Sequence, residues 1–268
     1  MPLILAHGQP KSGSTFLFEI AKWAVAHANG FPPGEFAEKF SLEPRLAQLY
    51  IEQPTADIVD AIEERLPEGK YYVIKTHGTL NPAIRARILN RTLLAFTSFR
   101  DPRDCIVSLL DAGMRDRAMG GERGFSRVLS VKDALKRTKF AWKNARDWAN
   151  CKEILKIPYY LTVTDRDLVV TLICEHIGLG MAANAVQAKF KLEQIKKISQ
   201  FNVGVADRFL DALSPADVAK ATLALENQIR KVDQLTERWM TEFGHRAAYE
   251  LIHTRREERL ARILNFAT

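Results

Sequence analysis

Residues 2–16 read PLILAHGQPKSGSTF. The apolar run Pro2–Ala6 predicts a short buried strand, and Gly8 opens the loop behind it. From Ser14 to Ala28 the spacing becomes helical, with one apolar stripe formed by Phe16, Ile20, Trp23 and His27. A strand, a glycine-containing loop and a helix in this order are typical of the unit that begins a parallel α/β sheet.

The rest of the chain continues the alternation of strands and helices. Further strands are predicted at Tyr71–Ile74, Leu93–Phe99 and Tyr159–Val163. Helices are predicted near residues 131–150, 215–243 and 247–264, short helices within 35–66, and a mobile loop at Asp111–Phe125. We therefore predict a three-layer α/β/α fold with a central parallel sheet of about four to five strands and a helix-rich C-terminal half. No linker divides the sequence, so residues 1–268 are interpreted as a single domain.

The composition favours an anionic partner. Lys and Arg number 39 against 32 Asp and Glu, which gives a formal charge of +7. A basic surplus attracts nucleic acid, an anionic membrane or a small molecule with phosphate or sulfate groups, although a basic solvated surface alone gives the same composition. Nucleic acid is not expected, because the sequence has no run of Lys and Arg with interleaved aromatic residues.

The cysteines and the apolar segments indicate the compartment. The 3 cysteines, odd in number and far apart, suggest neither a disulfide framework nor a zinc site. The N-terminal apolar run is too short for a signal peptide, and no stretch approaches the roughly 20 apolar residues that span a bilayer. We therefore expect a cytoplasmic protein without a transmembrane segment, and the sequence makes no prediction of its oligomeric state.

The loop that follows the first predicted strand has the composition of an anion site. Backbone N–H groups and the helix dipole attract a phosphate or sulfate at such a helix N-terminus. Gly8 and Gly13 have the spacing of the two glycines in a Walker A loop. The next residue, Ser14, stands where that motif has lysine, and Lys11 lies inside the loop instead. The alternative is an ordinary turn in which Ser14 and Thr15 only cap the helix.

Further features disfavour a nucleoside triphosphatase. A Walker A lysine acts together with Mg²⁺ on the β- and γ-phosphates. The third predicted strand ends in Phe99-Arg100 and not in a metal-binding aspartate. The dinucleotide-binding pattern G-x-G-x-x-G is also absent from the sequence. We therefore expect no metal site.

A second anion site is predicted at the end of the strand Leu93–Phe99. Arg100 lies at its carboxyl end, where open α/β sheets bind ligands. Ser108 follows about two turns into the next helix, where its hydroxyl can share a face with the helix start. A guanidinium and a hydroxyl in this arrangement suit a dianionic phosphate. The alternative is a surface ion pair between Arg100 and Asp104.

Together these motifs resemble those of the sulfotransferases that use 3′-phosphoadenosine 5′-phosphosulfate (PAPS), a family with a P-loop NTPase-like fold. Residues 10–16, PKSGSTF, are similar to that family's 5′-phosphosulfate loop, P-K-S-G-T-T-W. Residues 100–108, RDPRDCIVS, are similar to its 3′-phosphate motif, R-N-P-[RK]-D-x-x-x-S. The resemblance implies PAPS as co-substrate, adenosine 3′,5′-bisphosphate (PAP) as product, and no required metal. The nucleotide-binding residues that it implies are Lys11, Ser12, Gly13, Ser14, Thr15, Phe16, Arg100 and Ser108.

A third match is Lys75-Thr76-His77, which ends the second predicted strand and is similar to the K-T-H segment of the same family. The resemblance implies that His77 is the general base and that Lys75 acts on the transition state. The assignment is chemically sensible, because a neutral imidazole can take the proton of a weakly nucleophilic hydroxyl. Lys11 can stabilise the charge that develops on the bridging oxygen of the leaving nucleotide.

Parts of the chain depart from the family pattern. Phe16 replaces a tryptophan, which keeps an aromatic plane for stacking. The late Arg-Lys-Gly loop is not evident, and residues 201–209 are the segment nearest to it. Candidates for its role are Lys196, Lys197 and Arg208. The segment taken to follow the last strand, Val163–Leu168, lacks the tyrosine that the family has there, so its contact with adenine is not predicted.

The predicted protein is an enzyme, a sulfotransferase that moves a sulfuryl group from PAPS to a hydroxyl, with an amine as the second choice, of a small-molecule or carbohydrate acceptor. One alternative is a P-loop kinase-like phosphotransferase, which Ser14 in the Walker lysine position opposes. The other is a non-catalytic nucleotide-binding protein, which the intact set of lysines, histidine and arginine opposes. The acceptor is expected to contact residues 30–66, residues 111–130 and C-terminal helices. Candidate lining residues, with core packing as the alternative, are Phe31, Phe36 and Phe125.

Overall fold

A computed structural model of the chain describes residues 3–31, 35, 49–121, 124–190 and 204–265. Parallel strands form a 5-stranded sheet in the order β2-β3-β1-β4-β5. The strands are β1 (Leu3–Gly8), β2 (Tyr50–Ile51), β3 (Tyr72–Thr76), β4 (Leu94–Phe99) and β5 (Leu155–Pro158). The predicted parallel sheet is confirmed, and the short edge strand β2 was not predicted.

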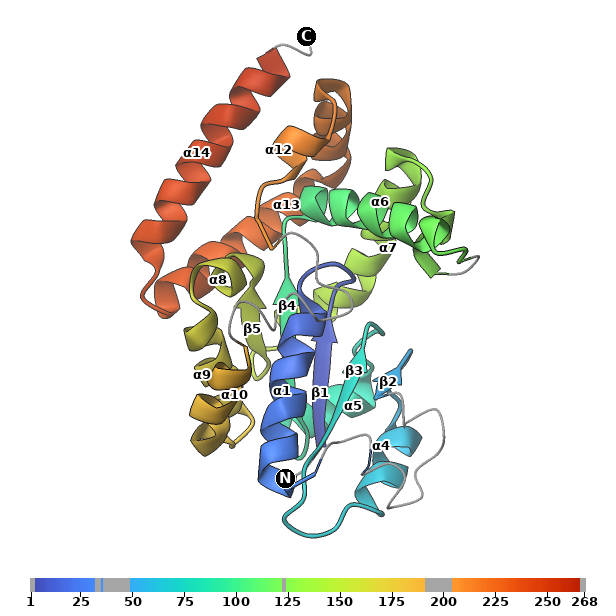
Figure 1. Cartoon of the computed structure of the whole chain (residues 1–268), viewed down its shortest axis with the longest axis vertical. Helices are drawn as coiled ribbons and strands as arrows, with labels where there is room; N and C mark the ends of the chain where they lie inside the picture. The colour runs from blue at the N-terminus through green and yellow to red at the C-terminus, as the bar shows by residue number, and fades with distance from the viewer. Residues whose placement is uncertain (1–2, 32–34, 36–48, 122–123, 191–203, 266–268) are drawn as a thin grey trace.

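Helices cover both faces of the sheet. Before β5 the chain forms α1 (Ser14–Asn29), α4 (Ala56–Glu63), α5 (Pro82–Leu89), α6 (Pro102–Ala118), the 3₁₀ turn η1 (Gly124–Arg127) and α7 (Val131–Asn150). After β5 it forms α8 (Tyr159–Thr164), α9 (Arg166–His176), η2 (Gly180–Ala182), α10 (Ala183–Lys189), α12 (Phe209–Ala212), α13 (Pro215–Glu242) and α14 (Arg246–Asn265). Figure 1 shows α1 in front of the strands and α7 behind them, which is the predicted three-layer arrangement with its helix-rich C-terminal half.

The register of the central strands brings their carboxyl ends to one edge of the sheet. β1 is buried along its whole length and pairs with β3 on one side and β4 on the other. His7 lies beside Thr76, and Gly8 lies beside Ser98. The segments that follow β1, β3 and β4 therefore begin next to one another, although they are far apart in the sequence.

The buried face of α1 differs from the predicted stripe. Phe16 and Ile20 are buried as predicted, but Trp23 is 39% exposed and His27 is exposed as well. The face that packs on the sheet is completed instead by Leu17, Ala21, Ala24 and Val25. A stripe based on large side chains alone misses the alanines, which are small enough to let a helix lie close to a sheet.

The last strand lies earlier in the chain than predicted. Residues 159–163 were predicted as a strand because aromatic and β-branched side chains favour strands. They form the helix α8 instead, and the strand is Leu155–Pro158. Pro158 has no N–H for the sheet ladder and stands at the N-cap of α8, so the strand ends there. The first residue after the last strand is therefore Tyr159.

The loop predicted at Asp111–Phe125 is largely helical, because α6 continues to Ala118. Gly113 lies within that helix as a packing glycine. A Cβ atom at Gly113 would lie 2.6 Å from the carbonyl oxygen of Val128 and 2.9 Å from that of Phe125. Its missing side chain thus lets α6 approach the 125–128 segment. Of the short helices predicted within 35–66, α4 is present, and residues 36–48 lie outside the described part of the chain.

Candidate functional site

The three sequence motifs meet at the carboxyl edge of the sheet. The loop 9–13 follows β1, Lys75-Thr76-His77 ends β3, and Arg100 follows β4 directly. The Lys75 ammonium donates a hydrogen bond to Thr15 Oγ1 at 2.7 Å. His77 Nδ1 lies 2.5 Å from the carbonyl oxygen of Gly8. The structure thus brings together segments that are 60 to 69 residues apart in the chain.

The loop after β1 is held closed by short polar contacts. The Ser12 hydroxyl lies 2.6 Å from the carbonyl oxygen of Gln9 and 2.6 Å from the hydroxyl of Ser98 on β4. A Cβ atom at Gly8 would lie 2.4 Å from Ser98 Oγ and 2.5 Å from Ser14 Cβ, so only glycine fits between β4 and α1. These contacts place the loop backbone directly over the first turn of α1.

The N-terminus of α1 has no side-chain cap. Its N-cap is Gly13, in the left-handed conformation with φ of 89°, and Ser14 and Thr15 are the first residues of the helix itself. The alternative that these two hydroxyls only cap the helix is therefore wrong. A helix start whose N–H groups are not capped by a side chain keeps its positive end available to an anion.

Two lysines lie beside this helix start. Burial is the main cause that lowers the pKa of Lys11 to about 8, with Arg115 as the next contributor. Burial followed by the charge of Lys11 lowers the pKa of Lys75 to about 8 as well. The Lys11 ammonium lies 4.0 Å from the ring centroid of Phe125. Both ammonium groups remain mostly cationic at neutral pH. Because they are partly buried, water screens their attraction for an anion less than it would at the surface.

His77 is neutral and has a defined tautomer. Burial, then Lys75 and Lys11, lower its pKa to about 4, against a smaller opposing effect of the Gly8 carbonyl. A carbonyl oxygen only accepts hydrogen bonds, so Nδ1 carries the proton and donates it to Gly8. Nε2 is then unprotonated and able to accept a proton, as a general base requires.

Arg100 is buried and already engaged. Its Nε and Nη2 donate to Asp104 Oδ2 at 3.1 and 2.9 Å, and Nη2 also donates to the carbonyl oxygen of Val205 at 2.9 Å. Nη1 lies 3.5 Å from the carbonyl oxygen of Lys11, beside the loop. The pair with Asp104 is therefore a buried one rather than a surface one. Ser108 lies buried on α6, about one turn after Asp104.

Residues 204–209, the described part of the segment compared with the late Arg-Lys-Gly loop, lie against the pair of Arg100 and Asp104. Asp104 accepts the backbone N–H groups of Asp207 at 2.9 Å and of Phe209 at 3.1 Å. Arg208 forms an ion pair of 2.8 Å with Asp111 on α6. Residues 204–209 thus join the Arg100 region, whereas the other two candidates, Lys196 and Lys197, lie outside the described residues.

Tyr159 lies beside Gly13 and Arg100, and the sequence analysis did not single it out. The guanidinium carbon of Arg100 lies 3.8 Å from its ring centroid. A Cβ atom at Gly13 would lie 3.1 Å from its ring. The tyrosine was overlooked because the last strand was placed over it. Pro158 was the signal that the strand ends one residue earlier.

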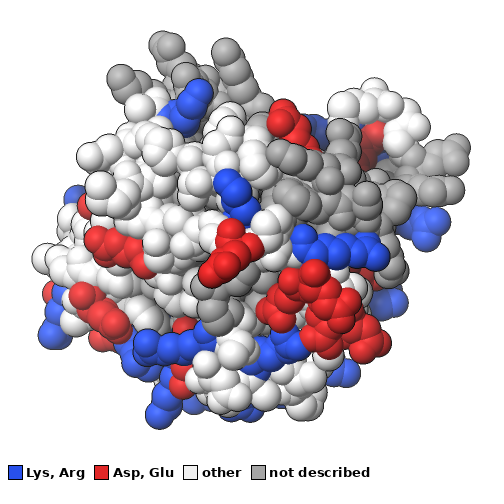
Figure 2. All heavy atoms as spheres, turned by 90° about the horizontal axis from the view of Figure 1, so that it is seen from below, with Lys and Arg blue, Asp and Glu red and all other residues white. Residues whose placement is uncertain are grey.

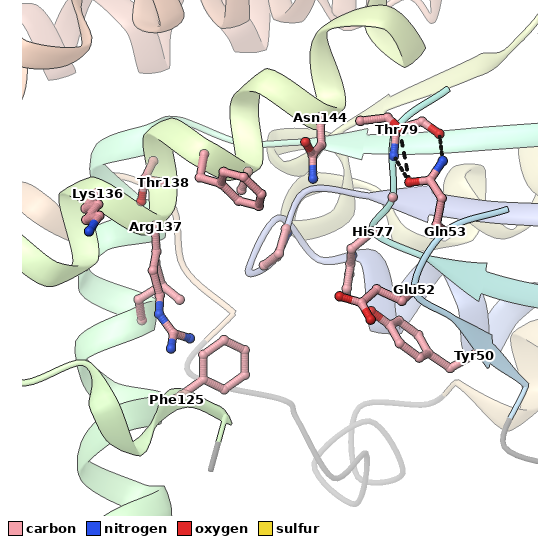
Figure 3. Close-up of a pocket in the computed structure, with 15 residues that line it drawn as sticks. Tyr50, Glu52, Gln53, His77, Thr79, Phe125, Lys136, Arg137, Thr138 and Asn144 are labelled. Atoms are coloured by element: carbon pink, nitrogen blue, oxygen red, sulfur yellow. Dashed lines mark hydrogen bonds between the residues drawn. The ribbon is translucent and has the colours of Figure 1, made fainter. Parts of the chain in front are cut away.

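A cavity of about 740 Å³ opens beside His77. Figure 3 shows Tyr50, Glu52, Gln53, His77 and Thr79 along one wall and residues of α7 along the other. The apolar part of the lining includes Leu109, Phe125, Phe140 and Ala141. Phe125 was a predicted lining residue and lies there, Phe31 packs against the main core instead, and Phe36 lies outside the described residues.

Charge is mixed on the surface away from this edge. On the face shown in Figure 2, Lys and Arg side chains alternate with Asp and Glu, and one group of acidic side chains adjoins at the lower right. Among the described residues there is no group of three or more His, Cys, Asp and Glu side chains that could hold a metal ion. Within the same residues, every helix is too short or too polar to cross a lipid bilayer.

The fold is the one seen in a solved structure of a PAP-bound protein. The chain is similar to a solved structure of retinol dehydratase in a complex with retinol and PAP, with a TM-score of 0.52 and 13% identity over 84% of this chain and 80% of that one. It also matches mouse sulfotransferase SULT7A1 complexed with PAP, with a TM-score of 0.47 and 16% identity over 93% of this chain and 88% of that one. No family model matches the sequence, and no curated protein is similar to it in sequence.

Proposed function

We propose that the chain transfers a sulfuryl group from PAPS to a hydroxyl group of a small-molecule acceptor. The observation that carries the proposal is the meeting of Lys75 with Thr15, and of His77 with Gly8, at the carboxyl edge of the sheet. This edge combines an uncapped helix start, two partly buried ammonium groups and a neutral imidazole. The combination suits in-line transfer of an anionic group to a nucleophile that must lose a proton.

The residues present fit the donor nucleotide. The loop after β1 offers backbone N–H groups over an uncapped helix, which is the arrangement that binds a terminal phosphate or sulfate. PAPS, when bound, supplies a sulfuryl group on a phosphate leaving group. We propose that this end is held by Lys11, Ser12, Gly13, Ser14 and Thr15. We also propose that Phe16 contributes an aromatic surface near the adenine ring.

Arg100 and Ser108 are proposed to hold the 3′-phosphate. Nη1 of Arg100 faces the loop, whereas Asp104 holds the other side of the guanidinium and keeps the group in place. Tyr159 lies between Gly13 and Arg100, so we propose it as a nucleotide contact in addition to the predicted residues. Arg208 is the proposed replacement for the missing Arg-Lys-Gly loop, because its segment lies on Asp104.

In the proposed reaction, His77 accepts the proton of the acceptor hydroxyl at Nε2. The acceptor oxygen forms the new bond to sulfur while the bond from sulfur to the bridging oxygen breaks. Lys11 and Lys75 stabilise the negative charge that collects on that bridging oxygen and on the transferring group. The products are a sulfated acceptor, PAP and a proton on His77 that is passed to solvent.

The cavity beside His77 is proposed as the acceptor site. Its volume of about 740 Å³ suits a small molecule, and its mainly apolar lining favours an alcohol with an apolar body over a carbohydrate. The retinol in the solved structure of retinol dehydratase is an alcohol of this kind. A carbohydrate or an amine acceptor remains a second choice for the acceptor screen.

The test is transfer of labelled sulfur from PAPS to a panel of apolar alcohols, phenols, amines and sugars, in the presence of EDTA. We expect label in one class of alcohol or phenol, and no loss of rate with EDTA. Transfer of phosphate from ATP that EDTA stops and Mg²⁺ restores would instead support the kinase-like alternative. PAP binding with no transfer to any acceptor class would support the non-catalytic one.

A further inference from the structure

We propose that Trp148 is a positioning residue that holds His77 against the acceptor wall. The inference rests on the proposed function of His77, and it assigns a role to a side chain that does not itself line the cavity. Its indole Nε1 donates a hydrogen bond of 2.9 Å to the carbonyl oxygen of Gly78, the residue next to His77. Trp148 belongs to α7, on the opposite side of the cavity from β3.

The Gly78 carbonyl is a constrained acceptor. A Cβ atom at Gly78 would lie 2.4 Å from the carbonyl oxygen of Glu52 and 2.7 Å from Gln53 Oε1. The Gly78 N–H also donates to Thr76 Oγ1 at 3.0 Å. The backbone after His77 is thus confined by the end of β2 on one side and by the Trp148 indole on the other.

The Trp148 ring has a second contact, with β1. It stacks on His7 with ring centroids 4.4 Å apart and planes within 4° of parallel. His7 is itself held by Thr97 on β4, through a 2.8 Å contact between Nδ1 and Oγ1. Both rings are buried, with exposed fractions of 0% for Trp148 and 1% for His7. A single rigid indole therefore contacts both β1 and the segment that follows His77.

These contacts close a ring of interactions around His77. Gly8, the neighbour of His7, accepts the hydrogen bond from His77 Nδ1. Gly78, the neighbour of His77, accepts the hydrogen bond from Trp148, which stacks on His7. The position and the tautomer of His77 thus depend on β1 and on α7 together.

The same helix supplies the far wall of the acceptor cavity. The residues of α7 that line the cavity are Lys136, Arg137, Thr138, Phe140, Ala141 and Asn144. The Trp148 hydrogen bond therefore sets the separation between this wall and the base. A small error in that separation matters, because transfer requires the acceptor oxygen within hydrogen-bond reach of Nε2.

Loss of the Trp148 N–H would also change the titration of His77. Without it, the 77–79 segment is free to move and admit water, which weakens the burial that lowers the His77 pKa. The charged or titratable groups that face His77 from the surrounding elements are Lys75, Lys11, His7, Tyr50, Glu52, Lys136 and Arg137. Of these groups, His7 also stacks on Trp148, so a replacement that keeps the stacking separates the burial of His77 from a change at His7.

The experiment compares Trp148→Phe with Trp142→Phe. Both variants lose a buried indole from α7, but Trp142 makes no side-chain hydrogen bond to the described residues. We expect Trp148→Phe to lower kcat by about 10²-fold, with an unchanged Kd for PAP, and Trp142→Phe to keep the parental kcat. The acid limb of the pH–rate profile should move from about 4 toward 6.5 in Trp148→Phe only.

If Trp148→Phe does not fold, a replacement that changes only the N–H donor of Trp148 tests the same hydrogen bond. 3-Benzothienylalanine at position 148 keeps the bicyclic ring that stacks on His7 and replaces only the N–H donor by sulfur. The His77 pKa is measured directly in each protein by NMR of the imidazole, which needs no turnover. Parental kcat and an unmoved His77 pKa in these proteins would overturn the positioning role. An inactive parent would instead count against sulfuryl transfer, and the imidazole titration would still decide the role of Trp148.

Discussion

The Lys75 ammonium donates a hydrogen bond of 2.7 Å to Thr15 Oγ1, and so joins the end of β3 to the first turn of α1. The two residues come from separate motifs that are 60 residues apart. The bond holds a cation next to the helix start that is proposed to bind the sulfate end of PAPS. Chemistry at this position therefore depends on both motifs.

Lys75→Met should lower the rate of sulfuryl transfer by roughly 10²-fold, the scale of losing one group that stabilises transition-state charge. Lys70→Met is the matched control, because Lys70 also donates from its ammonium, to the Asn29 carbonyl at 3.1 Å, but near the start of β3. Single-turnover transfer from PAPS measures both variants. Equal transfer rates for Lys75→Met and Lys70→Met would show that Lys75 does not stabilise the transition state.

His77→Ala should lower turnover by about 10²–10⁴-fold while PAP affinity stays nearly unchanged, because the base acts on the acceptor and not on the nucleotide. His176→Ala is the control, since His176 also makes a ring-nitrogen contact to a strand carbonyl, that of Ala95, at 2.7 Å. His176 lies on α9, away from the cavity. A transfer rate of His77→Ala equal to that of the parent protein would show that His77 is not the general base.

The rate of the chemical step should depend on pH through two limbs. Transfer requires neutral His77, so the rate falls as pH drops through its lowered pKa of about 4. It also requires charged Lys11 and Lys75, so the rate falls as pH rises through their pKa of about 8. Bound sulfate would favour the charged lysines and move the upper limb to higher pH. A pH profile of single-turnover rates checks this, and an acid limb near 6.5 would contradict the burial of His77.

Arg100→Gln should reduce the preference for PAP over AMP by roughly 2–3 kcal/mol, the scale of a charge-assisted hydrogen bond. Arg103→Gln is the control, because Arg103 is equally buried on α6 and pairs with Asp101 at 2.7 Å. Both variants should unfold more easily, since each removes the nearest cation from a buried carboxylate. Calorimetric titration of each nucleotide separates the two effects, and a preference retained in Arg100→Gln would place the 3′-phosphate elsewhere.

The strand-loop-helix unit and the Arg100 motif were predictable because their evidence is local in the sequence. A buried strand, a glycine where backbones approach and a lysine inside the loop all lie within residues 3–16, and the structure places them as expected. The error at Tyr159–Val163 was also local. High strand propensity was given more weight than Pro158, and the tyrosine next to Arg100 was missed as a result.

The acceptor cavity was not predictable in the same way. Its lining comes from residues 50–53, 77–79 and 136–144 together with Pro10, Leu109 and Phe125, and no single segment carries a pattern that marks it. Gly113 shows the difficulty, because its role in letting α6 approach Phe125 depends on a contact between two elements. The Trp148 contact with Gly78 likewise joins residues 70 apart, and helical spacing explains the indole equally well as ordinary core.

The central claim is that one ligand spans the Lys11 loop and the Arg100 site. Calorimetry of the parent protein with PAP, AMP and ATP, each with and without Mg²⁺, tests it most directly. We expect PAP to bind roughly 10²-fold more tightly than AMP, because only PAP carries the second phosphate, and Mg²⁺ to make no difference. Equal affinity for PAP and AMP, or tightest binding of ATP with a requirement for Mg²⁺, would contradict the claim.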